Sequence, residues 1–465
     1  MTRRIAVLTA AEIEPAYGTG PLLAIAAIAV LVLLTLIMKF KLHAFVALVL
    51  VSFLTALATR IPFAEVIPTL LDGFGSTLAN VALLVGLGAM IGRLLEVSGG
   101  AQVLADTLIR RFGEQRAPLA LGVASLLFGF PIFFDAGLVV MLPIIFSVAR
   151  RFGGSVLTYA LPAAGAFAVM HAFVPPHPGP VAASELLGAD IGLTVIIGLL
   201  IGIPTWYIAS YLFGISTGKR FVIPVPDDIA GEQEEDHRLP TFGTVLSILL
   251  LPLVLIFLNT GLNTLSTAGV VDGEATWVSA LRMVGQTPVA LLITVLVAMV
   301  LLREGRSAAT LEKIVDSALG PVCAIILVTG AGGMFGGVLR ASGIGEALAG
   351  SLESTGLPLI VAAFAVSTAL RVAQGSATVA LTTTAGLMAP TVAATSGLSS
   401  VDLACLVIAI ASGATVLSHV NDSGFWLVGK FLGMDEKTTL KTWTVMETLI
   451  GVVGFSFAAL VSAVL

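Results

Sequence analysis

A short polar run in the last quarter of the chain has the residue types that bind an anion. Arg371 is followed by Gln374, Ser376 and Thr378, and long apolar segments stand on both sides of the run. A guanidinium in a membrane-spanning region is costly and is usually paired and functional. A helix that restarts near Ser376 would also direct backbone N–H groups into the run. We therefore expect a site for a carboxylate flanked by hydroxyl groups, unless Arg371 only neutralises a buried acid such as Asp135.

An acidic residue occupies the corresponding polar break in the first half of the chain. Asp135 stands in the stretch Gly129-Phe-Pro-Ile-Phe-Phe-Asp-Ala-Gly137, among phenylalanines. Apolar surroundings favour the neutral acid, which suits a group that takes up and releases a proton. We expect Asp135 to couple transport to protons. The alternatives are an ion pair with Arg371, a cap on the following helix, or coupling to sodium.

Two further polar runs stand at equivalent places in the two halves. A proline-rich run holds His171 and His177, and a later run holds Asn421 and Asp422. Four prolines in six residues predict an extended stretch rather than a helix, and histidines near it can move protons. We expect His177, Asn421 and Asp422 to contact the substrate and His171 to assist proton coupling, although both histidines could be structural. No third ligand stands at a metal-binding spacing, so the sequence predicts no metal ion and no cofactor beyond the coupling proton.

The polar runs belong to two halves that share one sequence pattern. Gly86-Leu-Gly-Ala-Met-Ile-Gly92 recurs 244 residues later as Gly330-Ala-Gly-Gly-Met-Phe-Gly336. Ten of 23 positions are identical between residues 86–108 and 330–352. Repeated halves with corresponding interrupted segments are typical of secondary transporters, whose substrate site lies where the halves meet. The glycines taken singly would also be explained by close packing of helices.

The composition places these elements in a membrane. The chain has 465 residues, of which 57% are hydrophobic and 11% charged, and the net charge of −5 comes without a basic patch, which excludes nucleic acid as a partner. Cys323 and Cys405 lie in apolar segments and are expected to be core residues. Fourteen apolar segments approach the length of a bilayer crossing. They are residues 20–38, 42–59, 77–95, 117–130, 134–149, 156–173, 191–215, 242–259, 283–302, 319–339, 357–370, 377–395, 401–417 and 442–464.

The positive charges give the expected orientation. With the N-terminus outside and the segments alternating, 17 of the 23 lysines and arginines fall on the cytoplasmic side. The two glycine patterns are then seven crossings apart, so the halves have inverted topology. The expected organisation is an N-terminal segment (1–19), a first transmembrane repeat (20–215), a cytoplasmic linker (216–241) and a second repeat (242–465).

Four stretches resemble the signature sequences of the gluconate:proton symporter (gluconate permease) family, in the same order. They are Gly129-Phe-Pro-Ile-Phe-Phe-Asp-Ala-Gly137, Pro175-Pro-His-Pro-Gly-Pro180, Arg371-Val-Ala-Gln-Gly-Ser-Ala-Thr378 and Asn421-Asp-Ser-Gly-Phe-Trp426. The resemblance implies a bacterial inner-membrane permease that takes up gluconate and related sugar acids with protons. Some relatives carry other small hydroxylated acids, including D-serine.

The sequence thus predicts an all-α integral membrane protein with about 12–14 transmembrane helices in two inverted-topology repeats with broken or re-entrant segments. Its expected function is proton-coupled uptake of a small hydroxylated carboxylate by alternating access. A sodium-coupled or D-serine-type permease and an anion channel are the alternatives. No Gly-x-Ser-x-Gly elbow supports an enzyme. The expected partners are the carboxylate and the lipid bilayer, and the sequence leaves a homodimer open.

Overall fold

The computed structural model describes residues 15–226, 239–267, 270–303, 305–347, 351, 356–419 and 422–464, and all regular elements in them are helices. The helices of the first half are α1 (Thr19–Met38), α2 (Ala44–Ala58), α3 (Phe63–Val97), α4 (Gly100–Phe112), the 3-10 turn η1 (Glu114–Arg116), α5 (Ala117–Phe128), α6 (Phe134–Phe152), α7 (Leu157–Phe173), α8 (Pro178–Leu187), α9 (Ile191–Trp206), the π-helix η2 (Tyr207–Leu212) and α10 (Phe213–Arg220). The helices of the second half are α11 (Phe242–Thr267), α12 (Thr276–Gly285), α13 (Thr287–Leu301), α14 (Ala308–Ser317), α15 (Leu319–Ala341), α17 (Leu359–Gln374), α18 (Ala377–Ala394), α19 (Ser400–Gly413), α20 (Ser423–Phe431) and α21 (Glu436–Val464).

The all-helical membrane architecture is confirmed, with many short helices between the long ones. Eight of the described helices are long and apolar enough to cross a bilayer, or nine if the bent pair α12 and α13 forms one span. Several of the fourteen expected segments are shorter helices, such as α5 and α17, that end at breaks in the chain. The number of full crossings by length alone is therefore smaller than the number of apolar segments.

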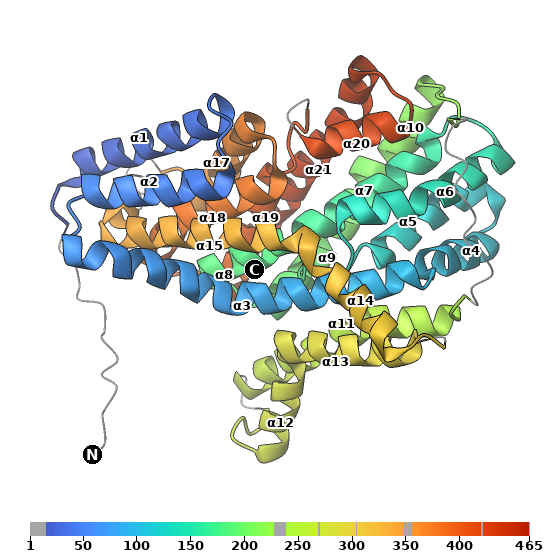
Figure 1. Cartoon of the computed structure of the whole chain (residues 1–465), viewed down its shortest axis with the longest axis horizontal. Helices are drawn as coiled ribbons and strands as arrows, with labels where there is room; N and C mark the ends of the chain where they lie inside the picture. Colours follow the sequence, from blue (N-terminus) through green and yellow to red (C-terminus); the bar gives the residue numbers. More distant parts are fainter. Residues whose placement is uncertain are drawn as a thin grey trace.

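The long helices α3 and α15, which carry the two glycine patterns, pack against each other in opposite directions (Figure 1). Gly73 of α3 lies against Gly333 of α15, while Arg93, near the other end of α3, donates a hydrogen bond to Ser317 just before α15 begins. A Cβ atom added to Gly333 would lie 2.6 Å from the carbonyl oxygen of Gly73, so the backbones touch only because side chains are absent. Helices with opposite directions are what the predicted inverted repeat requires.

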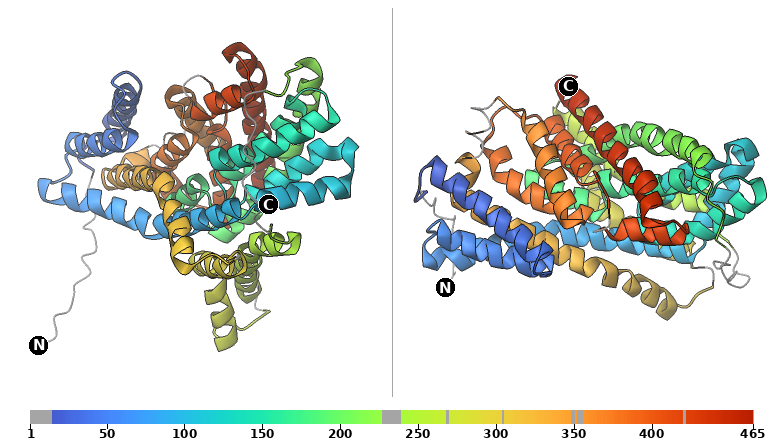
Figure 2. Two further views of the ribbon diagram at one scale, coloured as in Figure 1. Left: turned by 45° about the vertical axis from the view of Figure 1, so that its right-hand side comes forward. Right: turned by 90° about the horizontal axis from the view of Figure 1, so that it is seen from above.

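Corresponding helices of the two halves make corresponding contacts. α2 packs on α15, and α13, which stands 243 residues after α2, packs on α3. The pairs α5–α7 and α17–α19 pack in the same manner within their own halves. Both views in Figure 2 place α1 and α2 at the opposite end of the molecule from α4 and α6. The two halves are therefore interleaved around the α3–α15 pair.

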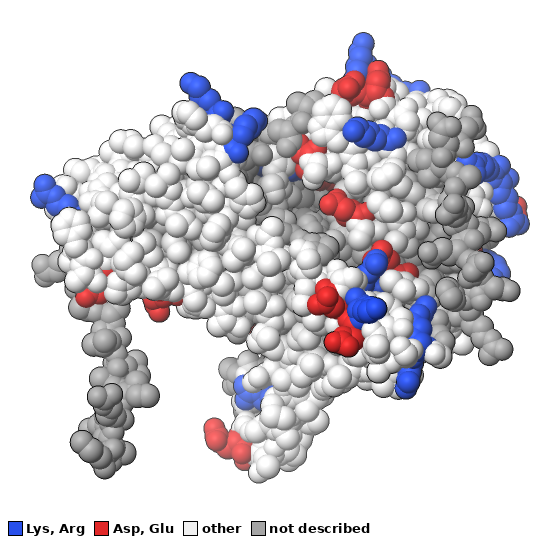
Figure 3. Space-filling model, in the orientation of Figure 1, with Lys and Arg blue, Asp and Glu red and all other residues white. Residues whose placement is uncertain are grey.

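Positive side chains gather at one end of the molecule. α4 ends with Arg110 and Arg111, α6 ends with Arg150 and Arg151, and α10 ends with a third basic pair, Lys219 and Arg220. Figure 3 shows most of the charged side chains on the right-hand part of the molecule, while the left part carries only a few at its margins around a broad uncharged area. The helix of the first repeat continues to Arg220, five residues beyond the predicted boundary, because polar residues follow the apolar run without breaking the helix. The middle of the predicted linker, residues 227–238, lies outside the described residues.

Candidate functional site

A cavity of about 860 Å³ lies where the two halves meet. Its wall is formed by the ends of helices that stop or start inside the protein, chiefly α6, α17, α18 and α20, together with the sides of α3, α7 and α21. Small-molecule sites have volumes of about 300–1,000 Å³. The polar residues on its wall include Asp135, His171, Arg371, Ser376, Thr378, Thr415, Asp422, Ser423, Trp443 and Glu447.

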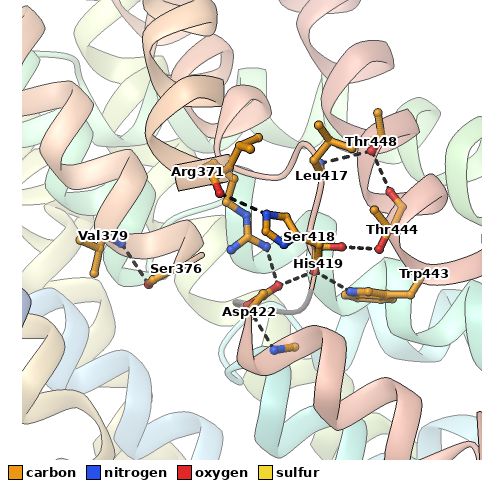
Figure 4. Close-up of polar contacts among 12 residues, drawn as sticks. Arg371, Ser376, Val379, Leu417, Ser418, His419, Asp422, Trp443, Thr444 and Thr448 are labelled. Carbon is orange, nitrogen blue, oxygen red and sulfur yellow. Dashed lines mark hydrogen bonds and ion pairs between the residues drawn. The ribbon is translucent and has the colours of Figure 1, made fainter. Parts of the chain in front are cut away.

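Arg371 and Asp422 form a buried ion pair in this wall (Figure 4). Arg371 Nη2 donates to Asp422 Oδ2 at 2.5 Å, and the arginine side chain is only 2% exposed. Asp422 also accepts from the hydroxyl of Ser418 and from the backbone N–H of Gly424. Trp443 Nε1 donates to Ser418 Oγ at 2.8 Å and so holds that hydroxyl in place. Three donors therefore fix the carboxylate, which in turn fixes the guanidinium.

The guanidinium keeps unused donors. Arg371 Nε and Nη1 are buried and have no hydrogen-bond partner among the residues that the structure describes. Buried donors without partners cost free energy, so a ligand that supplies acceptors is bound favourably. The two nitrogens point in different directions, so they suit two separate acceptors of an anionic ligand, such as a carboxylate oxygen and a hydroxyl.

The break beside Arg371 is shorter than the sequence predicted. α17 continues through Arg371 to Gln374, and the chain turns only at Gly375, where φ is +91° and favours glycine, and at Ser376. The prediction that a helix restarts near Ser376 is confirmed, because Ser376 Oγ accepts from the N–H of Val379 and caps α18. Ser376 and Thr378 lie on the cavity wall, as expected for substrate contacts. The side chain of Gln374 and the whole of Asn421 lie outside the described residues.

Asp135 and His171 face the same cavity from the first half. Asp135 lies in the first turn of α6, so it belongs to a helix rather than to the break, and its side chain is exposed to the cavity. His171 lines the wall from α7, and its Nδ1 is buried without a partner among the described residues. The ion pair between Arg371 and Asp135 is not formed, because Asp422 occupies that position.

His177 stands behind the wall and not on it. Its side chain is 2% exposed, and Nε2 donates to the carbonyl oxygen of Gly129 at 2.7 Å. Its ring packs against His171, with centroids 4.9 Å apart. The expected substrate contact is therefore not seen, and the histidine instead joins two breaks of the first half. The expected extended stretch is corrected as well, since α8 begins at Pro178, where the first turn of a helix tolerates proline.

Comparison with known proteins identifies the family. The sequence profile described as GntP family permease matches residues 21–464. The chain belongs to the GntP permease family. It is 38% identical over 448 residues to a gluconate permease of Pseudomonas aeruginosa, and the aligned region covers 95% of this chain and 97% of that protein. It is 40% identical over 461 residues to the inner membrane permease YgbN of Escherichia coli, with 96% and 100% covered.

The permease fold is also found in a solved structure of another transporter. The crystal structure of the Alcanivorax borkumensis YdaH transporter, described as having an unusual topology, matches with a TM-score of 0.63 and 13% identity over 90% of this chain and 98% of that one. The predicted family resemblance is thus confirmed. This permease is a multi-pass protein of the inner membrane and a transport protein rather than an enzyme.

Sequence reasoning missed a buried acidic residue of the permease cavity. Glu447 of α21 lines the wall beside Trp443, is 4% exposed, and has a buried Oε1 without a hydrogen-bond partner among the described residues. A usable signal was present, because Glu447 is the only charged residue in the apolar segment 442–464. An isolated acid in a membrane segment is a functional candidate by default.

Further polar residues of the permease cavity come from α3 and from the segments before α2 and α15. Arg93 forms an ion pair with Glu96 at 2.8 Å and a hydrogen bond with Ser317 at 3.2 Å, and all three line the cavity. His43, which follows Lys39 and Lys41 in the chain, also lines the cavity. The distribution of positive charges predicts that Arg93, Lys39 and Lys41 lie on the cytoplasmic side, so the cavity includes residues expected near that side.

Proposed function

We propose that this permease takes up gluconate, or a closely related small hydroxylated carboxylate, together with a proton. The observation that carries the proposal is the buried guanidinium of Arg371 on the wall of a cavity of suitable size, with two nitrogens that have no partner among the described residues. The relative from Pseudomonas aeruginosa is named a gluconate permease, which supports the same substrate class. The two lines of support are independent, since one comes from the geometry of the cavity and the other from sequence similarity to a named permease.

The wall offers groups for both parts of such a substrate. The carboxylate would accept from one of the two remaining nitrogens of Arg371, Nε or Nη1, and the other would donate to a substrate hydroxyl, while Nη2 stays on Asp422. The hydroxyl groups of the substrate would meet Ser376 and Thr378 at the start of α18. The positive end of the α18 dipole adds to the attraction for an anion.

The charge balance of the cavity supports coupling to a proton. Arg371 is neutralised by Asp422, while Asp135 and Glu447 add two further acids to the same wall. A substrate anion would raise the negative charge in a place with little water to screen it. Binding a proton at one of these acids offsets that cost. We propose that Asp135, which is exposed to the cavity, exchanges the proton with cavity water, and that His171 assists.

In this proposal alternating access follows because both halves of the chain contribute to one site. Breaks from both halves meet at one cavity, and the helices α3 and α15 that join the halves run in opposite directions. A rearrangement of one half against the other would close the cavity near Arg93 and open it on the opposite side.

Transport in proteoliposomes tests the proposal. Counterflow of labelled gluconate should be saturable, and an inward proton gradient should drive accumulation, which an ionophore should abolish. A panel of other aldonates, fructuronate and D-serine ranks the substrates under the same conditions. Accumulation that is driven by a sodium gradient and not by a proton gradient would show that sodium is the coupling ion. Conductance without saturable exchange would instead indicate a channel.

A further inference from the structure

We propose that Glu447 is the residue that holds the coupled proton beside the bound substrate. This inference rests on the proposed function, because it assigns one step of proton-coupled uptake to a particular side chain. Nothing in the sequence patterns singled out this residue, and its position in the cavity carries the assignment.

Glu447 and Trp443 present one face of α21 to the cavity. The two residues are one helical turn apart and both line the wall. Trp443 reaches the Arg371–Asp422 pair through its hydrogen bond to Ser418, so this face of α21 is anchored next to the ion pair. Glu447 also interacts electrostatically with both Arg371 and Asp422. A substrate carboxylate on Arg371 would therefore lie within the influence of Glu447.

The other acids of the wall are less suited to hold the proton. Asp422 accepts from Arg371, Ser418 and Gly424, and three donors stabilise its ionised form. Asp135 is exposed, so water in the cavity can hydrate its charge. Glu447 is 4% exposed, and its buried Oε1 has no donor among the described residues. A buried carboxylate without a partner is costly, and binding a proton removes that cost.

Several ionisable groups surround Glu447 and together set its protonation. Arg371 from α17 favours the carboxylate, whereas the acids favour the neutral form. Arg371 of α17 and Asp422 at the start of α20 act on Glu447 electrostatically, and Asp135 of α6 and His171 of α7 line the same cavity. Because Arg371 is already paired with Asp422, an added substrate anion tips this balance toward protonated Glu447.

The proposed cycle moves one proton and one anion together. Glu447 accepts a proton from water as the substrate carboxylate binds to Arg371, and its new O–H group can donate to a substrate oxygen. On the cytoplasmic side the proton returns to water. The restored carboxylate then repels the substrate and competes for Arg371, which promotes release.

Calorimetry on the purified, detergent-solubilised permease tests the assignment. Gluconate binding is measured in two buffers that differ in ionisation enthalpy, which gives the number of protons taken up per substrate. Wild type should take up about one proton, and the Kd should rise about tenfold per pH unit over the range in which Glu447 must gain its proton. Glu447→Gln should bind gluconate with no proton uptake and with a Kd that does not change with pH.

A matched variant and a conservative variant complete the design. Glu96→Gln removes an acid that lines the same cavity and should keep the proton uptake, because Glu96 is paired with Arg93 and has no part in the proposed coupling. Glu447→Asp keeps an acid and should restore proton uptake at least in part. Thermal melting of each variant shows whether the protein is folded. If Glu447→Gln does not fold, gluconate binding and proton uptake by Glu447→Asp provide the test instead.

The outcomes separate this inference from the proposed function. If wild type binds gluconate without proton uptake, proton coupling itself is refuted, and if it binds no gluconate, the substrate is wrong. If wild type takes up a proton and Glu447→Gln takes up the same proton, symport stands and the assignment to Glu447 is overturned. The assignment is also overturned if proton uptake disappears in Asp135→Asn and persists in Glu447→Gln.

Discussion

At the scale of single residues, Asp422 determines how Arg371 is presented to a ligand. The carboxylate occupies one nitrogen of the guanidinium, and its contacts with Ser418 and Gly424 prevent it from turning away. The plane of the guanidinium is thereby fixed before a substrate arrives, which lowers the cost of ordering the site on binding. In the proposed function the pair is thus both a structural contact and a preorganised site for the substrate carboxylate.

Replacing Arg371 by lysine should separate these two roles. Arg371→Lys keeps the charge that pairs with Asp422, so the melting temperature should change little. It loses the guanidinium nitrogens that remain for the substrate while one nitrogen is on Asp422, and a charge-assisted hydrogen bond is worth about 1.5–3 kcal/mol, so the Kd for gluconate should rise roughly 10- to 100-fold. Binding is measured by calorimetry, with Arg282→Lys, at a half-buried arginine of α12 that does not line the cavity, as the control. Wild-type affinity in Arg371→Lys and Arg371→Ala would mean that the arginine is only structural.

Asp135→Asn tests proton delivery from the cavity. The variant should still exchange labelled for unlabelled gluconate, because the anion contacts at Arg371 are intact. It should fail to accumulate substrate under a proton gradient, because the exchangeable acid on the wall is gone. Initial rates and steady-state accumulation in proteoliposomes give both quantities. Accumulation with unchanged pH dependence would move the role to His171, His177 or Asp422.

The site could be predicted from the sequence where polar residues interrupt apolar runs. Arg371, Ser376, Thr378, Asp422 and Asp135 were recognised in this way, and the structure brings all five to one cavity. The partner of Arg371 was not predictable, because several acids stood at plausible places and only the fold selects among them. A search for runs of polar residues also does not find a single acid in an apolar segment, such as Glu447 in α21.

At the scale of elements, apolar runs are a poor guide to where helices end. α17 continues past its apolar run because the N–H of Gly375 still bonds to the carbonyl of Arg371 at 2.9 Å. α3 begins at Phe63, well before the predicted residue 77, since Asp72 and Ser76 are accommodated on exposed parts of one continuous helix. Hydrogen bonding sets helix length, while hydrophobicity sets only the part that lies in lipid.

Close packing of α3 on α15 should depend on the glycines of the repeat. In Gly333→Ala the new Cβ would lie 2.0 Å from Thr77 Oγ1 and 2.6 Å from the Gly73 carbonyl oxygen, so the helices must separate. Overpacking of this kind costs about 1–3 kcal/mol. Unfolding in mixed micelles with increasing SDS measures the loss of stability.

Gly320 of the same helix provides the matched control. No atom lies within 4 Å of the position that a Cβ on Gly320 would occupy. Gly320→Ala should therefore leave the stability unchanged or raise it by up to about 1 kcal/mol, because alanine favours the helix. Equal effects of the two substitutions would show that helix propensity matters and close packing does not.

At the scale of the whole molecule, the antiparallel α3–α15 pair connects the repeat to the expected orientation. Ten identities in 23 positions indicated the duplication from the sequence alone, but not that the two copies touch. That contact depends on how all the other helices pack, so it belongs to the tertiary structure. The basic ends of α4, α6 and α10 add an independent marker, since they lie together at one end of the molecule.

The orientation yields a prediction that cysteine labelling can test in a Cys323→Ser, Cys405→Ala background. Lys219 lies at the basic end of α10, and Glu274 follows α11, whose 26 residues suffice for one crossing. If the basic end faces the cytoplasm, Glu274→Cys should react with a membrane-impermeant maleimide on intact cells, and Lys219→Cys only after permeabilisation. The native cysteines are removed because Cys323 is exposed. Labelling of both positions from the same side would contradict a single crossing by α11, and with it the inverted arrangement of the halves.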